Sequence, residues 1–358
     1  MTRSYLEQAI DDGGSGNAEV VRVLEQRLAE LVGAPYALCV SSGTTALISA
    51  LRALGVRPGD RVGVSSLGPA ITGLAVAAVG ATPVFLDCAS PTSFGLAASA
   101  ARRASRDGLS AAIAVPMWGY WDEDLSVLTD LRAAGIPIVV DAAQAPFLRL
   151  RQGLADVVDV VCLSLHSRKP LRAGEGGVCL TQNGRVAEKL LALRNCGQQT
   201  QFTGHRLDPT GPFGHHFGIN LKINALGAAW CLAQLDNLGA IHHQHQQLRE
   251  VARRAFDATG VRWVEANQSA DVERHGGYGL VALCEEPVEA LRMTTALTAE
   301  GDVEIDTLRY RYAPMDRARV FQASAVACPN AVQLTTTAVA CRLQAFAALS
   351  SNTRSVNS

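Results

Sequence analysis

The chain has 358 residues, of which 48% are hydrophobic and 18% are charged, and its formal net charge is -1. The length favours two domains over one small core, and the composition is typical of a soluble α/β enzyme. A near-neutral chain lacks the basic footprint of nucleic-acid-binding proteins, so we expect no nucleic-acid partner.

The cysteines and the first residues indicate the compartment. Nine cysteines are scattered along the chain without a C-x-x-C pair, and residues 1–12 are polar and contain acids, unlike a secretory signal peptide. Both features predict reduced thiols and a cytoplasmic location.

One apolar segment, residues 62–86, has no charged side chain and is long enough to cross a bilayer. Glycines and prolines divide it into strand, turn, helix, turn and strand, so a buried βαβ unit explains it better than a membrane span. We therefore expect no membrane association.

Helical and strand patterns alternate along the first two thirds of the chain. We expect helices at residues 1–12, 19–32, 46–54, 71–79, 125–134, 185–195 and 224–238. We expect strands at residues 36–40, 62–64, 83–87, 111–116, 138–140, 157–165 and 177–181. This alternation predicts a mostly parallel, doubly wound sheet.

The last third predicts a smaller α+β domain. Residues 196–218 are polar and rich in Gly, Gln and His, which is typical of an irregular loop. Beyond them we expect a helix at 241–258, strands near 261–264 and 279–284, and a helix at 287–299. The polar tail, 350–358, is expected to be disordered. We therefore place a large domain at residues 1–240 and a smaller one at 241–358.

Polar residues gather where strands of the large sheet end, and ligands bind beyond the carboxyl ends of such strands. The turn Ser41–Thr45 opens a helix, whose backbone N–H groups can face an anion, although a plain N-cap explains the same residues. Asp141 follows another strand, and Ser164 and His166 share one face at the end of a third. This convergence predicts a binding site.

Lys169 lies in the loop after that third strand, before the glycine-rich turn at 174–177. A partly desolvated lysine amine is nucleophilic and can be catalytic. Taken alone, Lys169 could equally be a surface residue in a basic loop with Arg168 and Arg172.

Four motifs in chain order resemble the DegT/DnrJ/EryC1/StrS family of sugar aminotransferases, which are fold-type I pyridoxal phosphate enzymes. They are Ser41-Ser42-Gly43-Thr44-Thr45, Asp141-Ala142-Ala143-Gln144, the stretch from Ser164 to Gly177, and Gly218-Ile219-Asn220-Leu221-Lys222. The resemblance extends from about Leu6 to about Ala345. It implies a three-layer αβα fold with a large, mostly parallel sheet domain and a smaller C-terminal α+β domain.

The resemblance also implies a role for each matching residue. Lys169 would be the catalytic Schiff-base lysine, and Asp141 would keep the pyridine nitrogen of pyridoxal phosphate protonated. Gln144 would bond the phenolic oxygen of the cofactor, and His166 would lie beside the ring or the lysine. The groups expected to bind the phosphate are Gly43, Thr44, Thr45 and Ser164, together with Asn220 from the partner subunit of a homodimer.

The activity implied by the resemblance is transfer of an amino group from glutamate or glutamine to a keto-sugar nucleotide or keto-cyclitol, in secondary-metabolite, antibiotic or polysaccharide biosynthesis. Several positions depart from the family pattern, among them Pro69, Lys222, Cys196 and the segment Tyr312-Ala313-Pro314-Met315-Asp316, which replaces a more usual P-L-H. Pro69 stands where an aromatic residue stacks on the cofactor, a role open to Trp118 or Tyr120, while Lys222 replaces an arginine and Cys196 a histidine. These departures leave a dehydratase, a lyase or a non-sugar ketone substrate open.

Two further alternatives are a non-catalytic protein and a metal site. A non-catalytic regulatory member of the family would fit the loss of Lys169 or Asp141, but both are present. His242, His243 and His245 lie among glutamines on an expected exposed helix, so they indicate a solvated face and no metal site.

Overall fold

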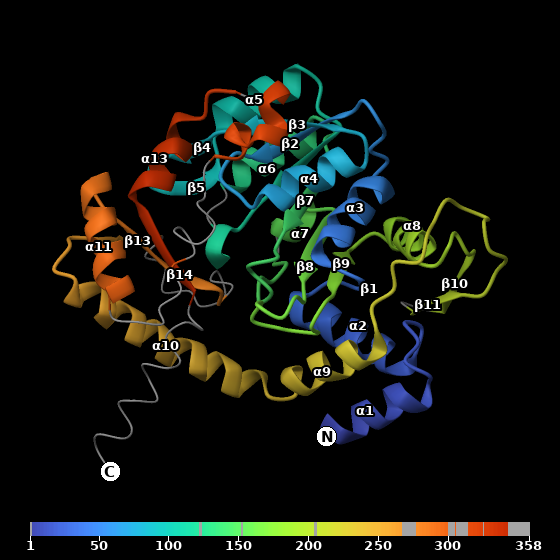
Figure 1. Ribbon diagram of the computed structural model, residues 1–358. Helices are drawn as coiled ribbons and strands as arrows, with labels where there is room; N and C mark the ends of the chain where they lie inside the picture. Colours follow the sequence, from blue (N-terminus) through green and yellow to red (C-terminus); the bar gives the residue numbers. More distant parts are fainter. Residues whose placement is uncertain are drawn as a thin grey trace, which may run out of the picture.

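The structure of the protein is a computed structural model. The structure describes residues 2–121, 124–151, 153–203, 206–266, 277–299, 305, 314–324 and 326–342. Its centre is a seven-stranded sheet in the order β1-β9-β8-β7-β6-β2-β3 (Figure 1). The bounds of these strands are β1 Tyr36–Val40, β2 Arg61–Ser65, β3 Thr82–Leu86, β6 Ala111–Ala114, β7 Ile138–Asp141, β8 Val160–Ser164 and β9 Gly177–Thr181.

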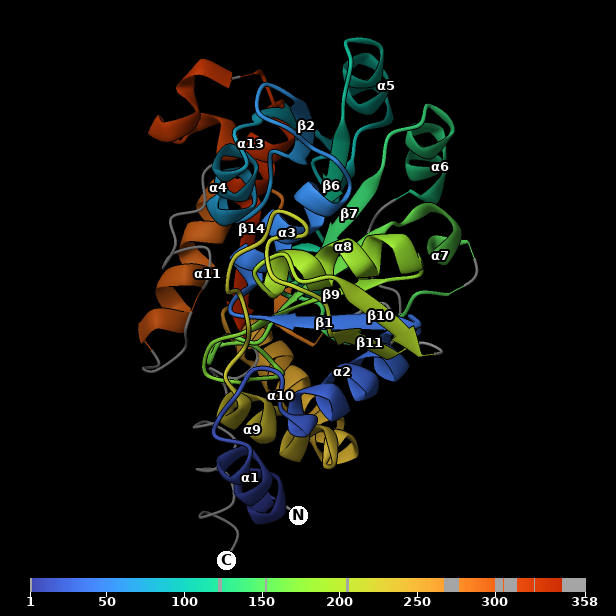
Figure 2. The same cartoon turned by 90° about the vertical axis from the view of Figure 1, so that its right-hand side faces the viewer.

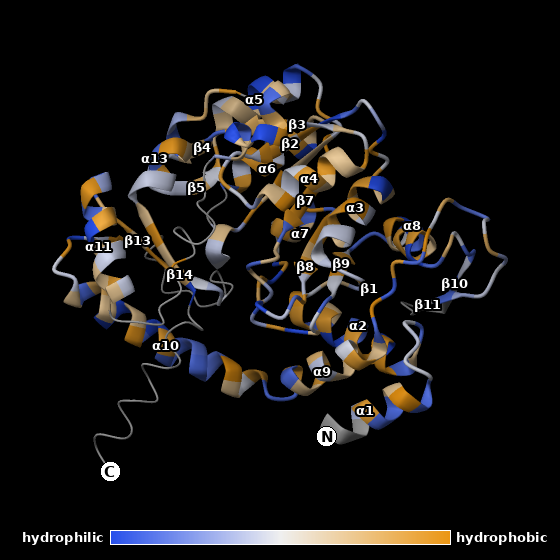
Figure 3. Cartoon of the chain, viewed as in Figure 1, coloured by the Kyte–Doolittle hydropathy of each residue, from blue (hydrophilic) through white to orange (hydrophobic). Residues whose placement is uncertain are grey.

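The central strands β7, β8 and β9 are apolar up to their last residues because both faces of the sheet are covered. Every residue of β7, β8 and β9 is buried, and Figure 3 shows these strands in the hydrophobic colours. Such continuous apolar runs are typical of parallel sheets with helices on both sides. Strands β3, β2, β6, β7 and β8 are parallel, whereas β9 pairs antiparallel with both β8 and β1.

Helices form a layer on each face of this sheet (Figure 2). One face packs against α3 (Gly43–Ala53), α4 (Ala70–Ala78) and α8 (Gly184–Arg194). The other face packs against α2 (Glu19–Val32), α5 (Ala98–Arg106), α6 (Leu125–Ala133) and α9 (Ala225–Leu235), and α1 (Thr2–Asp11) lies against α9. In α2 the apolar residues Val20, Leu24 and Leu28 recur every fourth position and are fully buried, as the sequence pattern predicts.

A second sheet lies towards the C-terminus, and α10 (Leu238–Ala258) leads to it along the lower edge of Figure 1. This C-terminal sheet has the order β12-β13-β14, with all pairs antiparallel. Its strands are β12 Val264–Glu265, β13 Gly279–Leu283 and β14 Ala338–Arg342. Its apolar residues form one core with α10 and α11 (Pro287–Ala299). The predicted three-layer α/β class with a smaller C-terminal sheet is thus confirmed.

The remaining elements are short. They are β4 Cys88–Ser90, β5 Ser93–Leu96, η1 Met117–Gly119, α7 Leu154–Val157, β10 Thr200–Thr203, β11 Arg206–Pro209, η2 Met315–Arg317, η3 Arg319–Ser324 and α13 Pro329–Thr337. The expectation of an irregular loop at 196–218 was wrong in part, because β10 and β11 form an antiparallel hairpin there. Polar residues can pair in this way because ladder hydrogen bonds use only the backbone.

Two further expectations concern the C-terminal tail and a membrane span. The tail at 350–358 lies outside the described residues. Among the helices that the structure describes, none combines the length and the apolar character needed to cross a membrane.

Candidate active site

The reversed strand β9 brings the loop after β1 and the loop after β8 together. Because β9 is antiparallel to both neighbours, β1 and β8 point the same way and end at the same edge of the sheet. Gly177, the first residue of β9, pairs with Val40 on one side and with Ser164 on the other. The predicted phosphate-binding turn and the lysine loop are therefore neighbours.

The turn after β1 is fixed by a capping box at the start of α3. The Ser42 hydroxyl accepts from the Thr45 amide (3.1 Å), and the Thr45 hydroxyl accepts from the Ser42 amide (2.9 Å). The Thr45 amide is thus already bonded, whereas those of Gly43 and Thr44 have no acceptor in the described part of the chain. These two amides can receive an anion at the positive end of the helix.

Ser164 lies directly against this turn. It is 8% exposed, and a Cβ added to Gly43 would stand 2.8 Å from the Ser164 Cβ and 3.1 Å from its hydroxyl oxygen. A Cβ on Gly177 would come within 2.2 Å of the Ser42 carbonyl oxygen. Only glycine therefore allows this approach, which sets the Ser164 hydroxyl beside the unpaired amides.

Asp141 ends β7 and is buried, with 5% of its surface exposed. Its carboxylate accepts from the Thr72 hydroxyl (2.6 Å) and from the Ala143 amide (3.2 Å). Burial raises the pKa of the Asp141 carboxyl, and the bonds from Thr72 and Ala143 and the charge of Lys169 lower it by smaller amounts. Because burial of a charged carboxylate costs free energy, the ionised form of Asp141 needs a positive charge beside it.

Lys169 is half-buried, and its Nζ lies 5.0 Å from the centre of the Tyr278 ring. The lysine backbone is held in a tight turn, because its amide donates to the His166 carbonyl (2.8 Å) and its own carbonyl accepts from the Arg172 Nε (3.2 Å). Lys169 is also close enough for its charge to lower the pKa of Asp141. The structure thus brings the predicted lysine and the predicted carboxylate into one site.

Gln144 is buried and turns its side-chain carbonyl towards Trp118, whose amide donates to it. This bond fixes Trp118 in a left-handed conformation (φ 54°), which is uncommon outside glycine. The Trp118 and Tyr120 rings both pack edge-on against Phe94, and the Tyr120 hydroxyl donates to Glu265 (3.2 Å). Because Glu265 belongs to β12, the Tyr120 hydroxyl links the loop after β6 to the C-terminal sheet.

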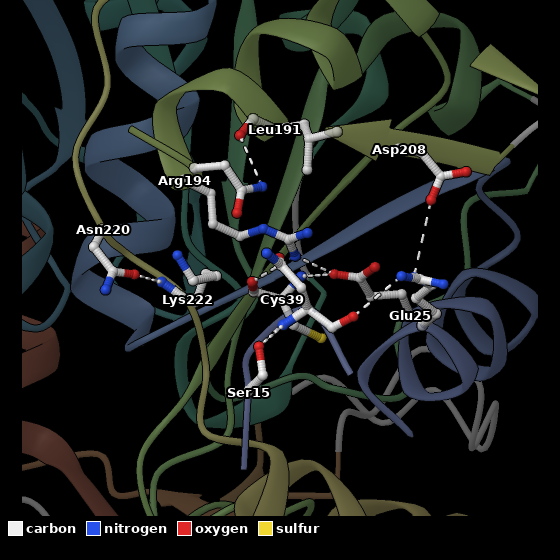
Figure 4. Close-up of polar contacts among 11 residues, drawn as sticks. Ser15, Glu25, Cys39, Leu191, Arg194, Asp208, Asn220 and Lys222 are labelled. Carbon is white, nitrogen blue, oxygen red and sulfur yellow. Dashed lines mark hydrogen bonds and ion pairs between the residues drawn. The ribbon is translucent and has the colours of Figure 1, made fainter. Parts of the chain in front are cut away.

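His166 and Asn220 lie at the rim of the site. The His166 Nδ1 accepts from the Arg168 amide (3.2 Å), and its Nε2 lies 3.5 Å from a Glu175 carboxylate oxygen. Asn220 is exposed, and its side-chain oxygen accepts from the Lys222 amide at 3.4 Å (Figure 4). Neither residue is buried as Asp141 is.

Figure 4 also shows the buried pair that supports β1. The Glu25 carboxylate accepts from the Cys39 amide (2.7 Å) and from Arg194, whose Nη1 also donates to the Cys39 carbonyl (2.9 Å). The backbone N–H and C=O groups of Cys39 in β1 thus both form hydrogen bonds with charged side chains. This fixes the strand that leads into the turn predicted to bind phosphate.

The expectation of a fully solvated histidine face on α10 was wrong in part. Only His243 is exposed, whereas His242 and His245 turn towards Phe147, with ring centres 4.6 and 6.0 Å away. Burial, aided by the positive charges nearby, lowers the pKa of His245 to about 4. In the part of the chain that the structure describes, no three His, Cys, Asp or Glu side chains are grouped as a metal site would require.

Two residues of the site were missed by the sequence analysis. Thr72, which bonds Asp141, lies in a predicted helix with no feature to distinguish it. Tyr278, 4% exposed, precedes β13 and meets Lys169 across more than a hundred residues of chain. Thr72 and Tyr278 are far from Asp141 and Lys169 in the sequence, so only the folded structure shows that they are in contact.

The side chains fit pyridoxal phosphate on chemical grounds. The buried Asp141 carboxylate suits the protonated pyridine nitrogen, and the Lys169 amine suits the aldehyde. The free amides of Gly43 and Thr44 beside Ser164 suit the phosphate. The Asp141 carboxylate, the loop that carries the Lys169 amine and the turn with the Gly43 and Thr44 amides all follow the carboxyl ends of strands of one sheet.

Comparisons with known proteins find relatives of this chain. A model of the DegT/DnrJ/EryC1/StrS aminotransferase family matches residues 2–353. Protein MosB of Rhizobium meliloti is 32% identical over 233 residues, covering 63% of this chain but only 46% of MosB. A putative L-glutamine:3-amino-2,3-dideoxy-scyllo-inosose aminotransferase of Streptomyces kanamyceticus is 27% identical over 334 residues, covering 90% of this chain and 77% of that protein.

The fold is also found among solved structures. The crystal structure of 3-amino-5-hydroxybenzoic acid synthase superposes with a TM-score of 0.80, covering 96% of this chain and 90% of that chain at 23% sequence identity. At this identity the match establishes the arrangement of helices and strands.

Proposed function

Because the chain belongs to the DegT/DnrJ/EryC1/StrS aminotransferase family, whose members are pyridoxal phosphate enzymes of fold type I, we propose that it transfers an amino group from glutamate or glutamine to a keto-sugar nucleotide or a keto-cyclitol. The observation that supports the proposal is that Asp141 ends β7, that the adjacent strand β8 leads into the loop of Lys169, and that the lysine charge acts on the Asp141 carboxyl. The similarity to an inosose aminotransferase favours a polyhydroxylated ring ketone.

Each residue of the site would have one task. Lys169 would hold the cofactor covalently and then, as a free amine, move the proton at the substrate carbon that carries nitrogen. Asp141 would keep a proton on the pyridine nitrogen, and Gln144 would bond the phenolic oxygen. The phosphate would be bound by Gly43, Thr44, Thr45 and Ser164 and by Asn220 from the partner subunit. When bound, pyridoxal phosphate supplies the electron sink for the reacting carbon.

His166 would complete the site beside the lysine. Its ring lies between the Arg168 amide and Glu175, which fixes its orientation at the rim of the lysine loop. In this place it would limit the movement of the loop and the access of water to Lys169.

The proposed transfer has a direct optical test. Purified protein loaded with pyridoxal phosphate should be yellow, and glutamate or glutamine should bleach the yellow band as the cofactor takes up the amino group. A keto-sugar or keto-cyclitol should then restore the band, and mass spectrometry should find the aminated product. A yellow protein that no amino acid bleaches would contradict transamination and favour a dehydratase or lyase instead.

We further propose a homodimer with shared active sites. Five apolar side chains on residues 213–230 are exposed by 44–71% and would be covered by a partner: Phe213, Phe217, Ile219, Leu226 and Trp230. Asn220, exposed among them, would reach the phosphate of the partner's site.

Asn220→Ala is expected to weaken cofactor binding about tenfold, because a hydrogen bond to a charged phosphate is lost, while the dimer persists. Equilibrium dialysis would measure the cofactor and sedimentation the mass. Gln246→Ala, on the exposed face of α10, is the matched control.

A mixture of Asn220→Ala and Lys169→Ala subunits tests the sharing directly. At a cofactor concentration too low to saturate Asn220→Ala, exchange of subunits should restore activity, because the lysine of one subunit is then combined with Asn220 of the other. A mixture with no more activity than its parts, or a fully active monomer, would rule out shared sites.

Two broader proposals concern the whole chain. We propose the division into a large domain at 1–240 and a smaller domain at 241–358, which the separate C-terminal sheet supports. We also propose a cytoplasmic location, in keeping with nine cysteines that form no disulfide within the described residues.

A further inference from the structure

The outer edge of β1 lies directly before the turn that is predicted to bind phosphate. β1 is the outermost strand of the seven-stranded sheet, with β9 on its inner side. An edge strand leaves the backbone groups of every second residue without a partner in the sheet. In β1 and the residue that follows it, these outward groups belong to Cys39 and Ser41. Whatever bonds them holds the strand at the point where the turn begins.

Arg194 is connected to this edge by two routes. The first uses its side chain, whose Nη1 donates to the Cys39 carbonyl (2.9 Å) and to the Glu25 carboxylate (Figure 4). The same carboxylate accepts from the Cys39 amide (2.7 Å). The second route uses the backbone: the Arg194 carbonyl accepts from the Leu221 amide (3.1 Å), and the Leu221 carbonyl accepts from the Ser41 amide (2.8 Å). Both outward residues of the edge are thus linked to Arg194.

The second route passes through the segment that carries Asn220. This segment runs beside the end of α8, because Asn220 forms a β-bridge with Asn195 and the Ile219 amide donates to the Leu193 carbonyl (3.0 Å). Asn220 is the residue proposed above to reach the phosphate of the partner's site. Arg194 therefore lies between two elements that are expected to bind phosphate, one in each site of the proposed dimer.

The position of these elements matters because hydrogen bonds to an anion weaken steeply when the donors shift or tilt. The Arg194 side chain is 5% exposed and that of Glu25 is 14% exposed, so water competes little for their bonds. A guanidinium is planar and permanently charged, and it holds two oxygens at once in a fixed geometry. Arg194 is therefore suited to keep β1 and its turn in one place.

We propose that Arg194 is a positioning residue for the phosphate of the cofactor. Through β1 it fixes the Gly43 and Thr44 amides of its own subunit. Through residues 219–222 it fixes Asn220 for the partner's site. This inference rests on the proposed aminotransferase function and its shared sites. It predicts that loss of the Arg194 side chain weakens binding of the phosphate group and leaves binding of the ring and aldehyde unchanged.

The test compares pyridoxal phosphate with pyridoxal, which has the same ring and aldehyde but no phosphate. Each compound is titrated into the apoprotein and followed by the absorbance of its bond to Lys169. In Arg194→Met the dissociation constant of pyridoxal phosphate should rise about tenfold, as expected when a hydrogen bond to a charged group is lost, while that of pyridoxal should stay within about twofold. An equal loss for both compounds, or no loss for either, would overturn the proposal.

Phosphorus NMR of the loaded enzyme gives a second, independent readout. The second ionisation of a free phosphate monoester has a pKa of about 6. Hydrogen-bond donors around the phosphate favour its dianion and so lower this pKa. The phosphate should therefore stay doubly ionised to a lower pH in the wild type than in Arg194→Met. A variant whose phosphate signal titrates as in the wild type would contradict the assignment.

A double variant separates this role from a purely structural one. Arg194→Met leaves the Glu25 carboxylate without its buried partner, which destabilises a fold. Glu25→Gln/Arg194→Met has no unpaired charge and keeps an acceptor for the Cys39 amide, so its melting temperature should exceed that of Arg194→Met. Its preference for pyridoxal phosphate should stay as weak, because the Cys39 carbonyl still lacks the guanidinium. A preference that returns with the stability would show that Arg194 has no positioning role.

Two single variants serve as controls. Glu25→Gln keeps Arg194 and an acceptor for the Cys39 amide, so it should bind both compounds as the wild type does. Arg27→Met removes an arginine of α2 that pairs with Asp236 (3.0 Å), and it should lower the melting temperature without changing the preference.

The wild type itself separates the two possible failures. If its apoprotein does not bind pyridoxal phosphate more tightly than pyridoxal, the predicted phosphate site and the proposed function fail together. If it does, and Arg194→Met keeps the same preference, only this inference fails.

Discussion

Replacing Lys169 by alanine is expected to lower turnover by roughly 10⁴-fold and to abolish the covalent bond to the cofactor. The lysine is the only amine that the structure places beside both Asp141 and the Tyr278 ring within the described residues. Borohydride reduction of the wild type followed by peptide mass mapping should find the cofactor on Lys169, and the variant should release it on dialysis.

Lys189→Ala is the matched control, because Lys189 donates to the Ala53 carbonyl (3.3 Å) on α3 and takes no part in the site. It should stay yellow and active. If Lys169→Ala kept a reducible cofactor bond, the assignment of the lysine would be lost.

Replacing Asp141 by asparagine is expected to have two opposite effects. In the loaded enzyme, loss of a buried ion pair of about 3–5 kcal/mol should cut turnover by roughly 10²- to 10⁴-fold and weaken cofactor binding. In the apoprotein the same change should raise stability, because burial raises the pKa of the Asp141 carboxyl and thus disfavours its charged form.

The sign of the pH dependence follows from that shift. The folded apoprotein keeps its proton on Asp141 to a higher pH than the unfolded chain does, whose carboxyl has a pKa near 3.8. Between the two pKa values the folded state binds more protons, so this group makes stability fall as the pH rises and then level off. Above the folded pKa, the apoprotein of Asp141→Asn should therefore unfold at a higher denaturant concentration than that of the wild type.

Urea titrations of the two apoproteins at a series of pH values measure this difference. Asp236→Asn serves as the control, because Asp236 pairs with Arg27 (3.0 Å) outside the site. That variant should lose stability slightly and bind the cofactor normally. An Asp141→Asn enzyme with full activity would show that the carboxylate has no part in catalysis.

Most of the central sheet could be predicted from the sequence because burial on both faces leaves a strong pattern. The expected strands at 36–40 and 177–181 coincide with β1 and β9, and the helix at 19–32 coincides with α2. The hairpin β10–β11 could not be predicted, since its polar residues show no alternation and its pairing lies in the backbone.

The site was predictable only where several of its residues stand together in the sequence. Asp141 with Gln144, and Ser164 with Lys169, form such runs, and the structure brings them to one edge of the sheet. Thr72, Tyr278 and Arg342, whose Nη1 donates to the Arg168 carbonyl, come from separate elements, and only tertiary packing gives them their partners.

The lysine loop is tied to the large sheet at both ends. Its two arms are joined by bonds from the Leu165 amide to the Gly176 carbonyl (2.8 Å) and from the Ser167 amide to the Gly174 carbonyl (2.8 Å), and both arms enter paired strands. Lys169 and Asp141 therefore belong to one rigid frame, whereas Arg342 belongs to the C-terminal sheet and Tyr278 directly precedes its strand β13. During evolution, small shifts of that sheet could change which substrate is accepted while the frame that holds the reactive amine stays the same.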